Sequence, residues 1–463
     1  MTLPCASRKP GYSMPRKTTD LVTESVPPGA TSALELSRRQ LLRGVAGSTA
    51  ISLLVTIPAT AASAAPAAAA DRPAGDVFWL VGTSSTEDGY IAQAVAPDAT
   101  VVAEIHGLQH AVGRTADGTR VVEAAAAAGV PTTLRVFAAG TGAVLQSIRG
   151  GFAWPAEPDL LVSVSPTSGT VAIVGTCFVG TPSGRTVVKE APDGGQRTVP
   201  TLSWQAYRGV EVFDAATGTL VSSSKPEQIA LGASDQLAHV GDEVLLLEHG
   251  ADRTQFAVSP TASVGSARTA LSGHAQLAHA DAGGRAYLLT DDGNLLIVGK
   301  GGARHTAALN LHAAEKLTAR PYTPTVVNTA ADTVAVVDAS RQYLATVDVA
   351  SGKVLAQRKL STASRFAPGM SLTGPGGAAV DTARGRLYVL DKSGVAGGVW
   401  VHDAHTLEVL DRWHSDVAFS LVWVAPGSGA VYLQTLEGPL AVHDAAGTLV
   451  SFVPSSLATA RAL

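Results

Sequence analysis

One short unit recurs along most of this sequence and restricts the folds that are open to the chain. A run of β-forming residues ends in an aspartate, a glycine-containing turn follows, and a second β-forming run begins. The clearest copies are residues 210–221 and 345–355, weaker copies are 399–409 and 441–450, and the copy at 134–144 lacks the aspartate. The aspartate can cap the turn, and the glycine can take a positive φ without a Cβ penalty. Each copy is therefore predicted to be a β-hairpin.

A second unit precedes the first and completes the repeat. It is an apolar strand, a turn with Pro, Asp or Gly, and a strand near a tyrosine, as in residues 380–388 and 424–432, with the turn also present at 164–169. The two units make four strands in about 35 to 60 residues, the size of a propeller blade. We therefore expect an all-β fold, a single β-propeller with four-stranded blades. The blades are expected near residues 109–148, 160–223, 235–271, 275–311, 324–360, 376–414 and 418–453.

The two ends of the repeat array leave the blade number at seven or eight. Residues 76–106 resemble three strands without a first one, and the tail at 455–463 can supply it. That arrangement gives eight blades, whereas a blade completed by the N-terminal segment itself gives seven. Closure of the ring removes exposed sheet edges that would otherwise pair with other chains.

Composition excludes some classes of protein. The formal net charge is −4 and lysines and arginines are not clustered, so no nucleic-acid partner is expected. Hydrophobic residues make up 46% of the chain, enough for a large core. Apart from Cys5 near the N-terminus, the one cysteine is Cys177, so the expected mature chain has no internal disulfide. Cys177 lies in the apolar run 171–179, where we expect it to pack as a small buried hydrophobe.

The N-terminal region carries the pattern of an export signal. Residues 37–43 read Ser-Arg-Arg-Gln-Leu-Leu-Arg, a moderately apolar run follows at 44–60, and A-x-A sequences stand at 62–64 and 68–70. Basic, apolar and small segments in this order predict a cleavable signal peptide. Arg38 and Arg39 resemble the twin-arginine motif, and this resemblance implies export of the folded chain by the twin-arginine translocase.

The apolar run is rich in small residues and is interrupted by Pro58, so we expect no retained membrane span. We assign residues 1–70 to an N-terminal extension with the signal peptide and residues 71–463 to the propeller. The mature protein is expected outside the cytoplasm, in the extracellular space, the cell wall or the periplasm.

The repeat pattern resembles the superfamily of propellers that includes YVTN-repeat proteins, lactonase-like propellers and the propeller subunit of quinoprotein amine dehydrogenases. The resemblance covers most of the expected mature chain, at the level of blade pattern. The WD dipeptides, kelch glycine pairs and Asp-box repeats of other propellers are absent from the sequence. The resemblance implies the fold and carries no catalytic residue over, and fold alone does not define function in this class.

Histidines form the sharpest chemical pattern. His239 and His279 end the matching sequences Gln-Leu-Ala-His in successive blades, at the expected innermost strand. His110 follows a glutamine at a similar place, and His274 begins the same strand as His279. If these imidazoles converge in the central channel, they can bind a transition metal or act as acid and base. The carboxylates expected to complete such a site are Glu104, Asp235, Asp281 and Asp381. The alternative is that each histidine simply makes a hydrogen bond within the blade structure.

Two further features suggest a binding surface. Phe152 and Trp154 lie in an expected loop, where aromatic side chains can stack on sugars or anchor a protein, although packing between blades is the commoner role. Residues 180–207 form a polar insertion that interrupts one blade, and we expect a long loop on one rim.

Three functions remain open on the sequence. The preferred one is a non-catalytic binding or scaffold module for an extracellular protein or a cell-surface polymer. The second is a channel-site enzyme, and the third is a quinoprotein-like dehydrogenase subunit whose partner carries the cofactor. The sequence has no G-x-S-x-G, H-E-x-x-H, C-x-x-C or Walker motif, so no reaction class is assigned.

Overall fold

The structure is a computed structural model. It describes the chain between residues 77 and 462 with gaps, the longest of which are 310–324 and 360–376. The expected signal peptide, with Arg38 and Arg39, lies outside the described residues. Within the described part, the regular structure consists of β-strands and one 3₁₀ turn, η2 (Lys300–Gly302). That part of the chain also contains no helix long and apolar enough to cross a membrane.

The strands form eight four-stranded antiparallel sheets, each one blade. We number the blades along the chain and write each from its innermost strand outward. Blade 1 is β32 (Leu457–Ala462), β1 (Phe78–Ser84), β2 (Tyr90–Val95) and β3 (Val101–Leu108); blade 2 is β4 (Ala111–Arg114), β5 (Arg120–Ala125), β6 (Pro131–Ala138) and β7 (Val144–Ala153); blade 3 is β8 (Asp159–Val164), β9 (Thr170–Glu190), β10 (Gln196–Asp214) and β11 (Thr219–Ile229); blade 4 is β12 (Ser234–Val240), β13 (Glu243–His249), β14 (Thr254–Ser259) and β15 (Thr269–Ala270).

The second half of the ring repeats the pattern. Blade 5 is β16 (Ala275–Ala280), β17 (Ala286–Thr290), β18 (Leu295–Val298) and β19 (Arg304–Ala307); blade 6 is β20 (Thr325–Ala330), β21 (Thr333–Asp338), β22 (Tyr343–Asp348) and β23 (Val354–Lys359); blade 7 is β24 (Ala378–Asp381), β25 (Arg386–Leu390), β26 (Val399–Asp403) and β27 (Val409–Trp413); blade 8 is β28 (Phe419–Val424), β29 (Val431–Thr435), β30 (Leu440–His443) and β31 (Leu449–Val453). The seven blades expected from the repeats each begin within two residues of the predicted start.

The ring closes through the C-terminal strand. β32 pairs antiparallel with β1, with Leu80 opposite Ala462 and Ser84 opposite Leu457. The first strands of neighbouring blades contact one another from β4 through β28 to β32, which identifies them as the innermost strands. The expected β-propeller is therefore confirmed, with eight blades among the described residues and the tail as the missing strand of blade 1.

The repeated aspartates cap their turns as the sequence predicts. Asp214 Oδ1 accepts hydrogen bonds from the amides of Ala216 and Thr217, at 2.7 and 3.0 Å. Asp348, Asp403 and Asp444 accept equivalent bonds in later blades. These bonds stabilise the carboxylate, so the pKa of each aspartate lies below its ordinary value. Gly218 follows with a φ of 74°, the left-handed conformation that suits glycine.

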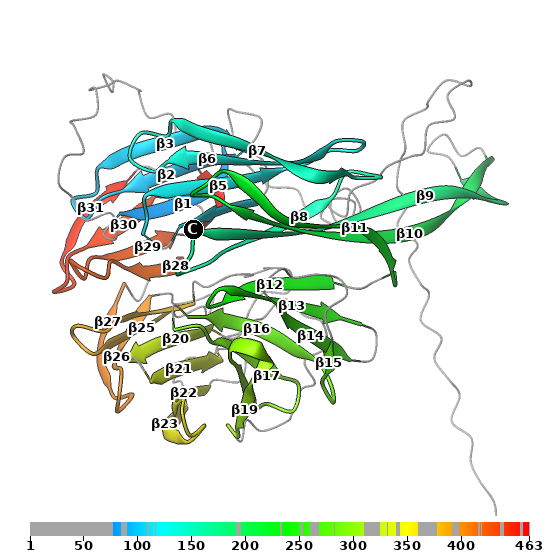
Figure 1. Cartoon of the computed structure of the whole chain (residues 1–463). Coiled ribbons are helices and arrows are strands. Elements are labelled where there is room, and N and C mark those ends of the chain that lie inside the picture. Colours follow the sequence, from blue (N-terminus) through cyan, green and yellow to red (C-terminus); the bar gives the residue numbers. More distant parts are fainter. Residues whose placement is uncertain are drawn as a thin grey trace, which may run out of the picture.

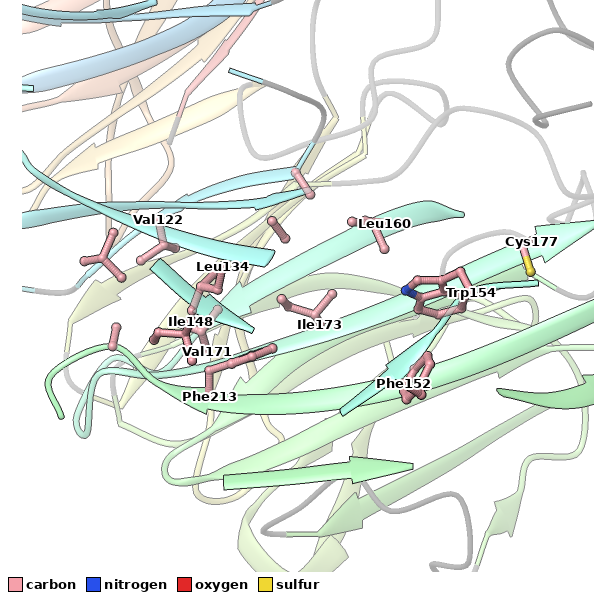
Figure 2. Packing of buried hydrophobic residues seen from close by; sticks show 14 of the residues in the cluster. Val122, Leu134, Ile148, Phe152, Trp154, Leu160, Val171, Ile173, Cys177 and Phe213 are labelled. Carbon is pink, nitrogen blue, oxygen red and sulfur yellow. The ribbon is translucent and has the colours of Figure 1, made fainter. Parts of the chain in front are cut away.

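The core lies between the blades, because both faces of each sheet are covered. Figure 2 shows one cluster, in which Trp154 lies near Ile173 and Cys177 of blade 3. Trp154 is 1% exposed and its Nε1–H donates to Thr132 Oγ1 at 3.0 Å. Of the two roles considered for Trp154, the structure shows packing between blades. Cys177 is fully buried, as predicted.

The insertion at 180–207 is not a loop. Its described residues form the outer parts of β9 and β10, which pair from Thr170 opposite Asp214 to Glu190 opposite Gln196, with one register irregularity between Pro200 and Leu202. Figure 1 shows this two-stranded ribbon extending beyond the other strands. Sequence reasoning missed it because the glycines and prolines of the segment resemble loop punctuation.

Removal of β32 should open the ring. A chain that ends at Val453 leaves the edge of β1 unpaired, so we expect a lower thermal midpoint and more aggregation in size-exclusion chromatography than for a chain that ends at Ala462. Equal melting of the two chains would show that the seam contributes nothing to stability.

Candidate functional site

The first of the predicted histidines, His239, makes contacts between blades and not in the channel. It is on the innermost strand β12, as expected, and is 2% exposed. Its Nδ1 lies 2.9 Å from Ser163 Oγ of blade 3, and its Nε2 lies 3.5 Å from Thr170 Oγ1. Burial lowers the pKa of His239 to about 4, with partial compensation by Asp242. A propeller blade turns both faces toward its neighbours, so an innermost strand directs this side chain into the blade interface.

His279 occupies the matching position in the sequence but a different one in the structure. β12 pairs with β13 without interruption, whereas β16 shifts register against β17 between Leu277 and His279. This extra residue turns His279 onto Tyr287, and the two rings stack at 5.9 Å between centroids. Tyr287 belongs to the core between blades 5 and 6, while His239 faces blade 3. A one-residue shift reverses the face of a strand.

The structure does not bring His239 and His279 together in one site. His274 lies outside β16 and lines a separate cavity, and His110 lies outside the described residues. Among the residues that the structure describes, no three His, Cys, Asp or Glu side chains gather as a metal site. The proposed carboxylates have partners elsewhere: Gln93 for Glu104, Arg208 for Asp235, Tyr287 for Asp281 and Arg384 for Asp381.

The cavity beside His274 is a polar hollow of about 500 Å³ in blades 4 and 5. His274, Asp291, Arg304 and His305 are among its lining residues. Its lining includes acidic groups, Asp291 and Asp292, and a basic group, Arg304. The imidazole of His305 already makes a hydrogen bond with the backbone carbonyl of Val349. This lining can hold a small polar molecule, but nothing in it selects one chemical class.

The ribbon formed by β9 and β10 is the most distinctive surface. β8 pairs with β9 only as far as Thr176, and β11 pairs with β10 only as far as Ala206. Beyond these residues no other strand of the described part of the chain pairs with either edge of the ribbon. From the pair Phe178–Ala206 to the pair Glu190–Gln196, at about 3.3 Å per residue, it reaches about 40 Å from the blade.

The side chains of the ribbon favour contact with another molecule. Residues 181–188 are all exposed, Val187 by 41% and Val188 by 61%, and Arg185 is their single charged residue. Exposed valines in the stretch 181–188, where Arg185 is the one charged residue, suit a protein interface, whose centre is depleted of charge. Pro182 and Pro200 lie one on each strand, where they interrupt hydrogen bonding and discourage pairing between ribbons.

A network of buried charges holds one side of the base of the ribbon. The Arg208 side chain on β10 is 3% exposed and lies 2.6 Å from Glu248, 2.7 Å from Glu227 and 3.4 Å from Asp235. Arg268 bridges Glu248 and Glu227 from outside, at 2.9 and 3.5 Å. Burial raises the pKa of Asp235 and the charge of Arg208 opposes that rise. Because loss of Arg208 would leave the buried carboxylate of Asp235 uncompensated, the network fixes blade 3 against blade 4.

Blade 2 holds the other side of the base. Glu211 on β10 accepts a hydrogen bond from the amide of Gly151, 2.6 Å away. The Trp154 ring lies so close to Gly175 and Gly209 that a Cβ at either glycine would overlap it or Phe152. The ribbon therefore starts from a base held on both sides. Sequence reasoning missed Arg208, although a charged residue inside an apolar strand is a signal of a buried ion pair.

Comparison with known proteins supports the fold alone. No family model matches the chain, and no curated protein matches it. The dihydro-heme d1 dehydrogenase NirN is similar over 84% of this chain and 75% of its own, with 14% identity and a TM-score of 0.52. BamB from Moraxella catarrhalis covers 74% of this chain and 87% of its own at 14% identity, with a TM-score of 0.43. The C-terminal WD40 domain of Sif2 is similar over 80% of this chain and 92% of its own, with 12% identity and a TM-score of 0.44. The fold of the chain is thus that of a β-propeller.

Buried His239 should make stability depend on pH. Its pKa is about 4 in the folded chain and 6.5 in the unfolded reference, so only the unfolded chain binds the proton between these values. Stability should therefore fall as the pH drops from 6.5 toward 4, by about 2 kcal/mol at pH 5 for this group. We expect urea unfolding of His239→Gln to lose less stability between pH 7.5 and pH 5 than the parent.

The matched control is His405→Gln, which changes an exposed histidine and should keep the parent's pH dependence. If the free energy of unfolding changes with pH equally in the parent and in His239→Gln, the lowered pKa of His239 is contradicted.

Proposed function

We propose that this chain is an exported, non-catalytic binding module that docks an extracellular protein through the β9–β10 ribbon. The observation that carries the proposal is the ribbon itself, a long arm that starts from a base held on both sides and exposes Val187 and Val188. An arm about 40 Å long with two faces can supply the roughly 800 Å² per partner of a specific protein interface. A protein is favoured over a cell-surface polymer because the large hydrophobic residues exposed on the described arm are Val187 and Val188. The tryptophan of the arm, Trp204, is instead half-buried against Gly180.

The channel-enzyme alternative has less support. It requires several histidines to share one site, and His239 and His279 face different neighbouring blades. No observation of the described residues favours a quinoprotein-like subunit over the binding module.

Changes at the exposed valines of the ribbon test its proposed role in binding a protein. A photo-crosslinking amino acid in place of Val188 should give a discrete product with one protein in the producing cells, because this side chain is available on the arm. The same group at Leu145 on β7, which is 53% exposed, is the matched control and should give none of that product. The double change Val187→Asp and Val188→Asp should abolish binding of the protein so identified, without a change in thermal midpoint.

Equal products from positions 188 and 145, or undiminished binding after the double change, would overturn the assignment of the ribbon. Val144→Asp with Leu145→Asp adds the same charge to another exposed pair and should leave binding intact.

Export through the twin-arginine translocase is part of the proposal and rests on the N-terminal sequence. Arg38→Lys combined with Arg39→Lys should retain the precursor in the cytoplasm, because lysine lacks the planar guanidinium. The measurement is an immunoblot of cytoplasmic and exported fractions. Arg43→Lys, outside the arginine pair, serves as the control, and undiminished export of the double variant would exclude this route.

A further inference from the structure

Two histidines from neighbouring blades meet at a place that the sequence pattern did not suggest. His443 ends β30 in blade 8, and His414 follows β27 in blade 7. Their Nε2 atoms lie 3.0 Å apart, and their ring centroids lie 4.8 Å apart. His443 is 1% exposed, whereas His414 is half-buried, so the pair lies at the edge of the blade interface.

The hydrogen bonding of His443 leaves its Nε2 available as a ligand. Its Nδ1 lies 3.2 Å from the carbonyl oxygen of Gly447, which can only accept, so Nδ1 carries the proton. In the neutral ring Nε2 then holds a lone pair directed at His414. Metal-binding histidines typically have this arrangement, with the second ring nitrogen donating to a carbonyl or carboxylate.

The spacing of the two rings fits a shared ion better than a linear hydrogen bond. A linear N–H···N bond of this length would place the centroids about 5.3 Å apart. Two rings directed at one ion, each nitrogen about 2.0 Å from it, would place them about 4.7 Å apart. The observed 4.8 Å is close to the second value.

We propose that His414 and His443 form a two-histidine site for a divalent transition metal between blades 7 and 8. In the described part of the chain no third His, Cys, Asp or Glu joins them, so water or an external ligand completes the coordination. Imidazole nitrogens with open positions favour Cu²⁺ most strongly among the first-row ions. The site does not depend on the proposed role of the ribbon.

A neighbouring tryptophan supplies an internal reporter. The Trp413 ring stacks on His443 with 5.5 Å between centroids, and its Nε1–H donates to Asp411 Oδ2 at 2.9 Å. A Cu²⁺ ion bound by His443 would lie close enough to quench this fluorescence. Metal binding at this site is thereby distinguishable from binding at other histidines of the chain.

The test is a titration of the expected mature chain, without a histidine tag and freed of metal, with CuCl₂. We expect saturable quenching at one Cu²⁺ per chain, and an electron paramagnetic resonance spectrum with coupling to two nitrogens. His414→Asn should weaken the binding about ten-fold or more, since even loss of a residue that only supports a ligand costs that much. Asparagine suits the test because it tolerates the positive φ of 48° at this position.

Two control variants isolate the site. His405→Asn removes an exposed histidine of blade 7 and should titrate like the parent. Trp413→Phe should reduce the quenching and keep the bound Cu²⁺. Absence of saturable binding in the parent, a spectrum without two nitrogens, or an unchanged titration of His414→Asn would each overturn the proposal and leave a plain hydrogen bond between the rings.

Discussion

Burial of sheet faces between neighbouring blades is the interaction on which the rest of this structure depends. Each blade is narrow and cannot cover its own apolar faces, so residues such as Tyr287 and Trp154 are buried only because another blade lies against them. The ring has a single seam within one blade, where β32 meets β1. That pairing joins the two ends of the chain and lets every face, including those of blade 1, be covered.

The same constraint explains where polar side chains occur. Since innermost strands pack against flanking blades, His239 meets Ser163 and Asp235 meets Arg208 across an interface. Buried polar groups need partners, and these contacts supply them. Polar residues on inner strands of this protein thus couple blades to one another, and their repetition along the sequence does not imply a shared site.

The two proposed binding sites lie where the chain departs from the repeat. Blade 3 continues into a ribbon beyond the length that packing requires, and its base is held by Arg208 on one side and Glu211 on the other. The His414–His443 contact lies at a second departure, a turn in which His414 has a positive φ. The repeated blades form the frame of the ring. The ribbon and the turn at His414 add surfaces that a regular blade does not have.

The sequence by itself determined the all-β class, the positions of the blades and the chemistry of their turns. These depend on local interactions, such as Asp214 with the amides that follow it, so a short segment contains the whole signal. The folded structure alone decided which face His279 occupies, which carboxylates meet Arg208, and that His414 reaches His443. Each of these outcomes depends on a one-residue bulge or on a contact between distant segments. Neither produces a periodic sequence pattern from which it could be predicted.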